Sequence, residues 1–232
     1  QRVEGIVRAA AHADDLVTAR MQLCDDLQAD TAITASDEDS RHSERPLTNA
    51  NLVVKVGIFS HPQADRTSRM KYAAYGSNLH PLRLTSRISS ARLIASAYLP
   101  DWSLHFHKRS KDKSGKCNIR RGGEGVHFAI FDISAGDKRV LDRIEGVGVG
   151  YSEIGLSIPG IGECLSYTAA ESHIDDSLEP YDWYKELVVI GARFHEFPAG
   201  YVNQIESVPA TEDPDPDRRL REWKIVESAT RY

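Results

Sequence analysis

Cysteine is scarce in this sequence, and it has no long apolar run. The three cysteines, Cys24, Cys117 and Cys164, lie far apart and show no metal-like pairing. A sparse, odd set predicts reduced thiols in a cytoplasmic protein rather than a disulfide framework. No apolar segment approaches the length of a transmembrane helix, so we expect no membrane span.

An excess of positive charge is also missing. The formal net charge of −5 offers no general attraction to nucleic acid or to an anionic membrane, and we expect neither as a partner. Hydrophobic residues make up 41% and charged residues 27% of the chain, which is ordinary for a globular protein. A chain of 232 residues can form one well-buried domain with an appendage.

The segment His107–Arg121 is the main exception to this charge balance. Its cations would suit phosphate contacts, but Lys111–Lys116 is more simply a solvated turn between strands. No interleaved aromatic residues support base stacking. His105 and His107 point the same way on a strand, but no carboxylate, cysteine or third histidine stands at ligand spacing. We therefore expect neither a metal nor a nucleic-acid site here.

The strongest local signal is the octapeptide Tyr72–Leu79, which reads Tyr-Ala-Ala-Tyr-Gly-Ser-Asn-Leu. Its first four residues predict a short buried strand, which Gly76, Ser77 and Asn78 break before a turn that contains Pro81. A strand that ends in this way exposes backbone N–H groups that no ladder satisfies, and such a nest suits a carboxylate or an oxyanion. Taken alone, Gly-Ser-Asn is more often an ordinary strand-to-loop turn.

A second signal is the segment Ser134–Gly146, which predicts a helix. Ser134 is the expected N-cap, with Asp137 as its partner in a capping box, and Gly146 stands where a helix usually stops. The apolar residues share one helical face: Val140, Leu141 and Ile144. Glu145 then faces the negative end of the helix dipole, which costs about 0.3–1 kcal/mol. Such a carboxylate indicates either a functional site or a solvated glutamate near a helix end.

The remaining patterns show no βαβαβ rhythm and no internal repeat. Strands are expected at Ala91–Tyr98, Ser103–Lys108 and Val126–Ile133, with a hairpin of Tyr151–Ile158 and Glu163–Ala169. Helices are expected at Tyr181–Phe194, Pro198–Ser207 and Pro216 to about Val226, the last capped by the acidic turn Asp213–Asp217. Strands interrupted by a few helices predict an α+β domain with a curled mixed sheet.

Together, the octapeptide and the segment Asp142–Gly146, with Tyr151 shortly after it, resemble the γ-glutamylcyclotransferase superfamily. The resemblance covers Met70 to about Pro216 and implies a small mixed β-barrel with surrounding helices. It also implies an enzyme without a cofactor, in which the α-amine of a γ-glutamyl compound attacks its own γ-carbonyl. The products are 5-oxoproline and a free amine. The implied partner is a small-molecule γ-glutamyl substrate, and the implied state is a monomer or a homodimer.

The resemblance also assigns site residues. Glu145 is the expected base, which later protonates the leaving amine, and we expect burial beside Ile144 and Val147 to raise its pKa. The main-chain N–H groups of Gly76, Ser77 and Asn78 are the expected donors to the substrate. Four tyrosines are expected to line the substrate, unless they serve only in aromatic packing with satisfied hydroxyls: Tyr75, Tyr151, Tyr167 and Tyr184.

Two alternative functions stay open. The same fold could act on another γ-glutamyl donor, such as a γ-glutamylamine or a γ-glutamyl-acyl intermediate. A non-catalytic module could instead use the pocket to bind an acidic metabolite, but such a module gains nothing from a badly placed carboxylate at Glu145.

The residues before Met70 differ from the rest. We expect an amphipathic helix at Val3–Leu27, a linker at Thr31–Asn51 and a short strand at Leu52–Phe59. Because proteins of the resembled family start close to the signature strand, residues 1–69 are expected to be an N-terminal extension upstream of a natural start at Met70. The alternative is a genuine appendage. Residues 70–232 are expected to form the domain and its C-terminal helix.

Overall fold

The structure is a computed structural model that describes residues 68–232. The helix, linker and strand expected before residue 60 lie outside the described residues. Strand β1 (Arg69–Ala74) begins just before Met70, and the carbonyl of Ser68 accepts a hydrogen bond from the Ala135 N–H at 2.9 Å. The Arg69 guanidinium pairs with Asp132, which lies on the neighbouring strand. The two residues before Met70 therefore take part in the fold.

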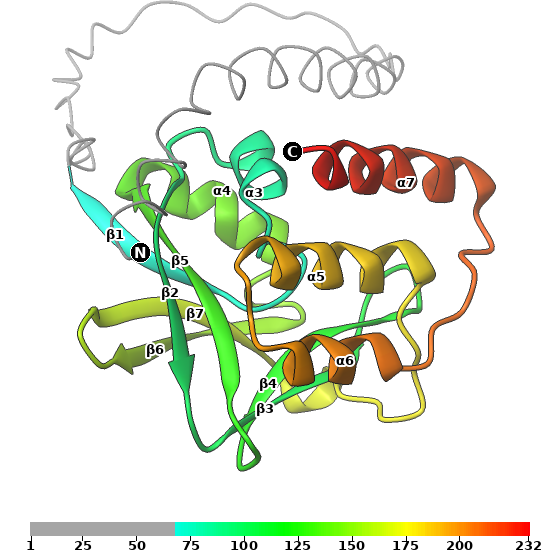
Figure 1. Cartoon of the computed structure of the whole chain (residues 1–232), viewed down its shortest axis with the longest axis horizontal. Coiled ribbons are helices and arrows are strands. Elements are labelled where there is room, and N and C mark those ends of the chain that lie inside the picture. The colour runs from blue at the N-terminus through cyan, green and yellow to red at the C-terminus, as the bar shows by residue number, and fades with distance from the viewer. Residues whose placement is uncertain (1–67) are drawn as a thin grey trace, which may run out of the picture. The chain divides into compact units, whose positions relative to one another are not determined.

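Five strands form a mixed sheet in the order β2-β5-β1-β7-β6 (Figure 1). β1 pairs parallel with β7, and the other neighbours are antiparallel, which confirms the expected mixed sheet and the α+β class. The bounds are β2 Arg92–Leu99, β5 Val126–Ser134, β6 Tyr151–Ile158 and β7 Gly162–Ala169. β3 (Trp102–Arg109) and β4 (Gly115–Arg121) form a separate two-stranded sheet. Within the described residues, the ladders thus make two sheets rather than one closed ring.

A buried side chain joins the two sheets. The Asn118 Oδ1 atom on β4 accepts the Ala169 N–H at 2.7 Å and the Thr168 hydroxyl at 3.1 Å, both from β7. The Thr168 hydroxyl also lies 3.2 Å from the carbonyl of Ile119. Because these polar groups are enclosed, their mutual hydrogen bonds fix the position of β4 against the larger sheet.

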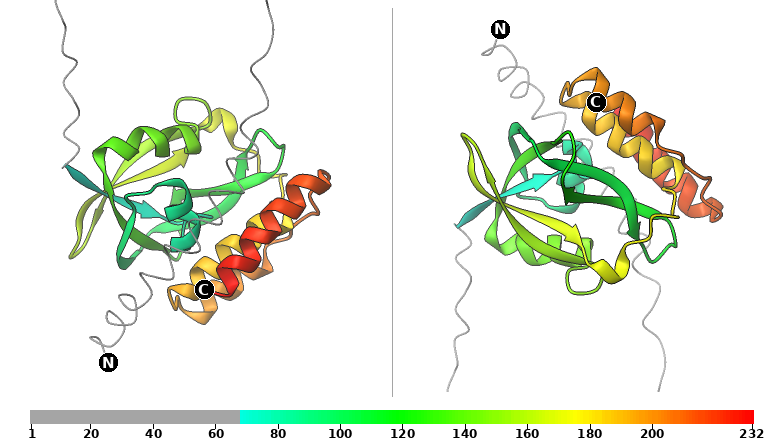
Figure 2. Two further views of the ribbon diagram at one scale, coloured as in Figure 1. Left: turned by 90° about the horizontal axis from the view of Figure 1, so that it is seen from above. Right: turned by 90° about the horizontal axis from the view of Figure 1, so that it is seen from below.

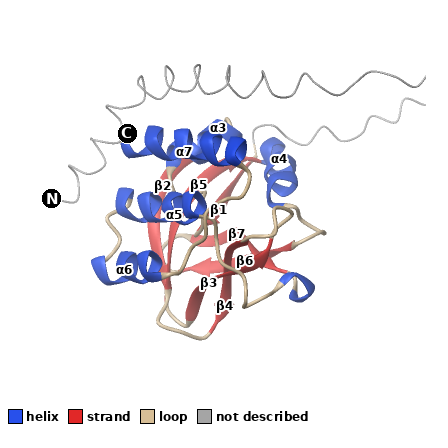
Figure 3. Ribbon diagram, turned by 90° about the vertical axis from the view of Figure 1, so that its right-hand side faces the viewer, coloured by secondary structure: helices blue, strands red, loops and turns tan. Residues whose placement is uncertain are grey.

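Helices cover the sheets from two sides. α5 (Asp182–Phe194), α6 (Ala199–Ser207) and α7 (Pro216–Thr230) gather on one side of the strands, and α4 (Ala135–Glu145) lies on the other (Figure 2). Figure 3 shows the short helix α3 (Pro81–Arg87) beside α7. The strand β5 between the layers is almost continuously apolar, and Phe128, Ile130 and Phe131 are fully buried. No helix of the described residues is long and apolar enough to span a membrane.

Two expected loops are regular elements. The turn expected around Pro81 is helix α3, with Pro81 in its first turn and the His80 ring accepting the Leu82 N–H at 3.2 Å. Proline suits a first helical turn, but seven residues are too few for a clear apolar period. The C-terminal half of the basic segment is strand β4, so Lys116 is not in a solvated turn but in a strand paired with β3.

The start of α4 differs in one detail from the expectation. Ser134 is the N-cap and accepts the Asp137 N–H at 3.2 Å, as predicted. The Asp137 carboxylate does not complete the capping box, because it accepts the Ser90 N–H at 3.1 Å. The Ser134 N–H donates instead to the Ser90 hydroxyl at 2.9 Å. The helix start is therefore tied to the residues before β2, a contact that local sequence does not reveal.

Candidate functional site

One cavity collects all the site residues expected from the sequence. Its empty space, with the open solvent at its mouth included, is about 310 Å³. It lies where β1 ends, against the end of α4 and the start of α5. The expected residues that line it are Tyr75, Gly76, Ser77, Asn78, Glu145, Tyr151, Tyr167 and Tyr184; Tyr72 and Cys117 complete the lining.

The end of α4 places Glu145 at this cavity. Gly146 adopts the left-handed conformation at φ 71°, which glycine reaches without strain. The Val147 N–H then bonds the carbonyl of Asp142 at 3.0 Å and closes the helix. Leu141 is fully buried and Ile144 is 40% exposed, and burial raises the pKa of Glu145 as expected. The glutamate side chain lines the cavity together with the tyrosines and the Asn78 loop.

The Glu145 carboxylate is held by one amide and surrounded by cations at longer range. Its Oε1 atom accepts a hydrogen bond from the Asn78 Nδ2 atom at 2.8 Å. Burial raises the pKa of Glu145, while the charges of Arg87 and Lys108 and the hydrogen bond from Asn78 act in the opposite direction. Burial prevails, so this carboxyl group holds its proton more tightly than a solvated glutamate. A raised pKa suits a group that must take and return a proton near neutral pH.

The loop after β1 presents main-chain donors to the same cavity. The Leu79 N–H bonds the carbonyl of Gly76 at 2.9 Å and closes a tight turn. Within the described part of the chain, no protein acceptor takes the N–H groups of Gly76, Ser77 or Asn78. The φ angle of Gly76 lies outside the left-handed region, so glycine is not needed there for its conformation. It is needed for space, because a Cβ atom would lie 3.0 Å from the Cys117 Cβ atom.

Arg87, which no local sequence pattern indicates, orients Asn78. The Arg87 Nη1 atom donates to the Asn78 Oδ1 atom at 3.2 Å. This contact fixes which end of the amide faces Glu145, because Oδ1 is occupied by the guanidinium and the NH₂ group is left to donate. Arg87 lies in the last turn of α3, a helix that the sequence did not predict. The second arginine of this helix, Arg83, is buried and pairs with Glu222 on α7 at 3.1 Å.

The tyrosines form the walls of the cavity, and most of their hydroxyls bond the main chain. The Tyr75 hydroxyl donates to the carbonyl of Tyr167 at 2.7 Å, and the Tyr151 hydroxyl donates to the carbonyl of Cys117. The Tyr184 hydroxyl accepts the Cys117 N–H at 3.1 Å. The structure therefore combines the two expected roles: these rings pack, and they also line the cavity.

Two residues of the cavity were not singled out as site residues. Tyr72 was expected only as part of the buried strand, but its hydroxyl lies 3.3 Å from the Asn78 Nδ2 atom, beside Glu145. Burial raises the pKa of Tyr72 well above its usual value, and the Glu145 charge adds to this effect. Cys117 lies on β4, and burial raises the pKa of its thiol to about 12. Alternation along the strand could have indicated Tyr72, but no local signal marks Cys117.

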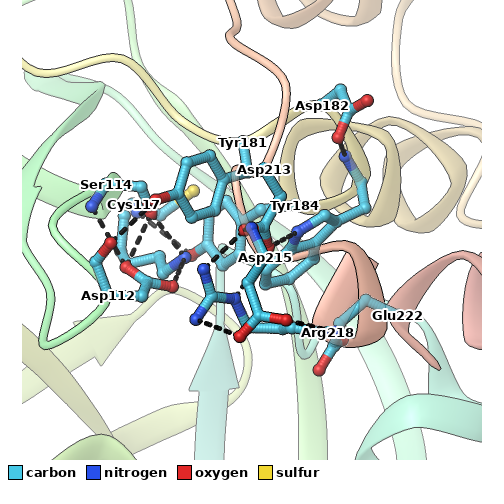
Figure 4. Close-up of polar contacts among 12 residues, drawn as sticks. Asp112, Ser114, Cys117, Tyr181, Asp182, Tyr184, Asp213, Asp215, Arg218 and Glu222 are labelled. Atoms are coloured by element: carbon cyan, nitrogen blue, oxygen red, sulfur yellow. Dashed lines mark hydrogen bonds and ion pairs between the residues drawn. The ribbon is translucent and has the colours of Figure 1, made fainter. Parts of the chain in front are cut away.

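A polar cluster supports the cavity from behind Tyr184. Lys116 pairs with Asp112 at 2.8 Å, and its ammonium lies 4.5 Å from the centre of the Tyr184 ring. Next to it, the buried Asp213 accepts the Trp183 indole N–H at 2.8 Å and the Arg218 Nε atom at 2.7 Å (Figure 4). The Arg218 guanidinium lowers the pKa of Asp213 to about 2 despite burial.

This cluster confirms the expected acidic cap of α7 and adds a role for it. Asp215 is the N-cap and accepts the Arg218 N–H at 3.0 Å, with Pro216 in the first turn. Asp213 acts differently, because it ties the start of α7 to Trp183 on α5. Trp183 is the neighbour of Tyr184, so the C-terminal helix supports one wall of the cavity.

The two histidines of β3 do stack, with ring centres 4.6 Å apart. A carboxylate does reach them: the Asp176 Oδ1 atom lies 2.6 Å from the His107 Nδ1 atom, although none was expected from the spacing. The Nε2 atom of His107 is bonded to Asn118 at 3.0 Å, so both ring nitrogens already have protein partners. Within the described residues, no group of three or more His, Cys, Asp or Glu side chains could hold a metal ion.

Comparison with known proteins identifies the fold. No family model and no curated protein matches the sequence. Among solved structures, a gamma-glutamyl cyclotransferase has a TM-score of 0.61 and 23% identity, over 69% of this chain and 99% of that one. An uncharacterized protein from Homo sapiens has a TM-score of 0.59 and 24% identity, over 68% and 98% of the two chains.

A third match is YkqA from Bacillus subtilis, with a TM-score of 0.52 and 16% identity, over 62% of this chain and 56% of that one. The described domain therefore has the gamma-glutamyl cyclotransferase fold, as the two sequence signatures indicated. At these identities the likeness concerns the fold, and the reaction has to be argued from the cavity.

Proposed function

We propose that this protein is a γ-glutamylcyclotransferase-type enzyme, which converts a γ-glutamyl compound to 5-oxoproline and a free amine. One observation carries the proposal: the enclosed carboxylate of Glu145 lines the same cavity as the unpaired N–H groups of Gly76, Ser77 and Asn78. The reaction needs a proton acceptor and donors to a developing oxyanion, and these are the two kinds of group that the cavity offers.

The proposed step is intramolecular. The α-nitrogen of the γ-glutamyl group forms a bond to its own γ-carbonyl carbon, and the bond from that carbon to the leaving nitrogen breaks. An α-ammonium that becomes a lactam N–H loses two protons, and the leaving amine gains two when it departs as an ammonium. Glu145 carries these protons one after the other, and its raised pKa suits both directions of transfer. The N–H groups of the loop stabilise the oxyanion or the α-carboxylate.

The lining of the cavity supports a reaction without a covalent intermediate. Cys117 is a poor nucleophile, because a thiol with a pKa of about 12 stays protonated near neutral pH. Ser77 has a hydroxyl, but no histidine or lysine is among the residues that line the cavity and could activate it. Holding the substrate curled among the tyrosines would supply the orientation that the attack needs.

Release of 5-oxoproline from purified protein tests the proposal. The panel should contain γ-glutamyl dipeptides and a γ-glutamyl alkylamide, with 5-oxoproline measured by chromatography. Turnover that is lost in Glu145→Gln and retained in Glu163→Gln, which alters an exposed residue of β7, would support it. Binding of glutamate or 5-oxoproline without turnover of any compound would instead favour the non-catalytic module.

A further inference from the structure

A second, larger hollow lies beside the cavity on the side of Glu145. We call it the basic groove; it holds about 1160 Å³ of empty space up to its open face. One wall is the end of β3 and the turn after it, and the other is the end of α4 with the loop of residues 146–150. Five basic side chains line it: Lys108, Arg109, Lys111, Arg143 and His173.

The charge of this groove is largely uncompensated. Within the described residues, Lys108, Lys111 and Arg143 have no carboxylate within ion-pair distance, whereas Arg109 pairs with Asp175 at 3.1 Å. The acidic side chain on the wall, Asp142, already bonds Lys138 at 2.7 Å and the Tyr167 hydroxyl at 2.8 Å. Three cations on the walls of one groove, none of them within ion-pair distance of a carboxylate among the described residues, produce a positive potential, which raises the local concentration of anions.

The basic groove adjoins the cavity. The Lys108 ammonium lies 4.6 Å from the centre of the Tyr151 ring, which lines the cavity. The charge of Lys108 also lowers the pKa of Glu145 against the effect of burial, so the two groups are close enough to interact. Gly146, on the wall of the groove, directly follows Glu145 in the chain. The walls of the two hollows therefore touch at Lys108 and Tyr151, and again at the end of α4.

We propose that the basic groove binds the leaving-amine half of the substrate and selects an amine that carries two or more carboxylates. This inference rests on the proposed cyclotransferase function and names its substrate class: γ-glutamyl peptides of acidic amino acids rather than γ-glutamyl alkylamines. A neutral amine leaves Lys108, Lys111 and Arg143 without a carboxylate partner. An amine with a single carboxylate pairs with only one of these three cations. An acidic residue on the amine side offers a main-chain and a side-chain carboxylate to the two walls.

Matched substrates test the charge preference. γ-Glutamyl-glutamate and γ-glutamyl-glutamine have the same shape and differ by one charge, and γ-glutamyl-propylamide has no charge on its amine half. We expect kcat/KM to be about 5- to 10-fold higher for the glutamate than for the glutamine compound at low salt, the size of one or two exposed ion pairs. Near 1 M salt, where the Debye length is about 3 Å, the preference should largely disappear.

Variants of the two groove walls test which residues cause the preference for the glutamate compound. In the double variant Lys111→Gln with Arg143→Gln, the preference should fall below about 2-fold. Lys113→Gln is the matched control, because Lys113 is exposed in the same turn as Lys111 but does not line the groove.

The outcomes separate the inference from the function on which it rests. Equal kcat/KM for all three compounds, or a preference that the double variant keeps, would overturn the role of the groove and leave the cyclotransferase function standing. Absence of 5-oxoproline from every compound would overturn the function and the inference with it.

Discussion

Glu145→Gln should abolish turnover and, at neutral pH, make the protein more stable. The substitution keeps the shape of the side chain, and the Gln oxygen can still accept the hydrogen bond that Asn78 now gives to Glu145 at 2.8 Å. Only the proton acceptor is removed. A lost general base typically lowers the rate about 10²–10⁴-fold, and we expect a loss of 5-oxoproline formation in this range.

The stability effect follows from the pKa of Glu145, which burial raises above its ordinary value. The folded state then binds this proton more tightly than the unfolded state. The favourable contribution is complete below the unfolded pKa of about 4.3 and is lost as pH rises through the folded pKa. Above that pKa the wild type carries an enclosed charge that the glutamine variant lacks. We expect the variant to be more stable there by about 1 kcal/mol, or about 2–4 °C in Tm.

The assay is thermal unfolding followed by circular dichroism at several pH values, with turnover measured on the same samples. The Tm of Glu145→Gln should exceed that of the wild type near pH 8, and the difference should close toward pH 4. Glu163→Gln should show neither the loss of rate nor the change in Tm. In the wild type, kcat/KM should decline as pH falls through the raised pKa. A variant that stays as active as the wild type refutes the base, and a Tm difference that does not vary with pH refutes the electrostatic argument.

Four further perturbations test the loop, its contact with Arg87 and the start of the domain. Gly76→Val should abolish activity, because a side chain there meets the cavity wall. Ser77→Ala should keep an activity within about 3-fold of the wild type. A Ser77→Ala variant that is folded by circular dichroism but inactive would favour covalent catalysis. Arg87→Met should lower kcat about 10-fold with little change in KM, because it frees the Asn78 amide. It should also shift the pH profile toward higher pH, because it removes a charge that lowers the pKa of Glu145. An unchanged pH profile would exclude this positioning role. A chain that begins at Met70 should be as active as one that begins at residue 65. It should be less stable by about 1–3 kcal/mol, because it lacks the hydrogen bonds of residues 68 and 69. Identical melting curves would show that these contacts contribute nothing.

Local signals were enough for the two segments that frame the cavity. The strand before Gly76 and the helix that ends at Glu145 are specified by patterns of a few residues: apolar strand residues, a serine N-cap and a glycine after the last turn. The hairpin β6–β7 and the three C-terminal helices were also predicted within a few residues at each end. Each of these elements is long enough to show a period or carries its own stop signal.

The parts that were missed depend on contacts between distant residues. β4 is polar and basic in sequence, and its strand character comes from pairing with β3 and from the bonds of Asn118 to β7. Arg87 reaches Asn78 only because α3 folds back over the loop, and Asp176 reaches His107 from 69 residues away. Charge pattern alone predicted Lys116 as solvated, yet aromatic side chains from α5 cover it. In each case the partner, rather than the residue itself, decides the environment.

The hydrogen bonds of the cavity tyrosines imply that the cavity and the basic groove diverge at different rates in evolution. Loss of Tyr75 or Tyr151 would leave an enclosed backbone carbonyl without its donor, a change that typically costs about 1–3 kcal/mol. Lys111 and Arg143 in the basic groove have no carboxylate within ion-pair distance among the described residues, and replacing either deprives no buried group of a partner. Under the proposed function, single tolerated substitutions in the groove change which amine is released, while the cavity proposed to receive the γ-glutamyl group stays the same.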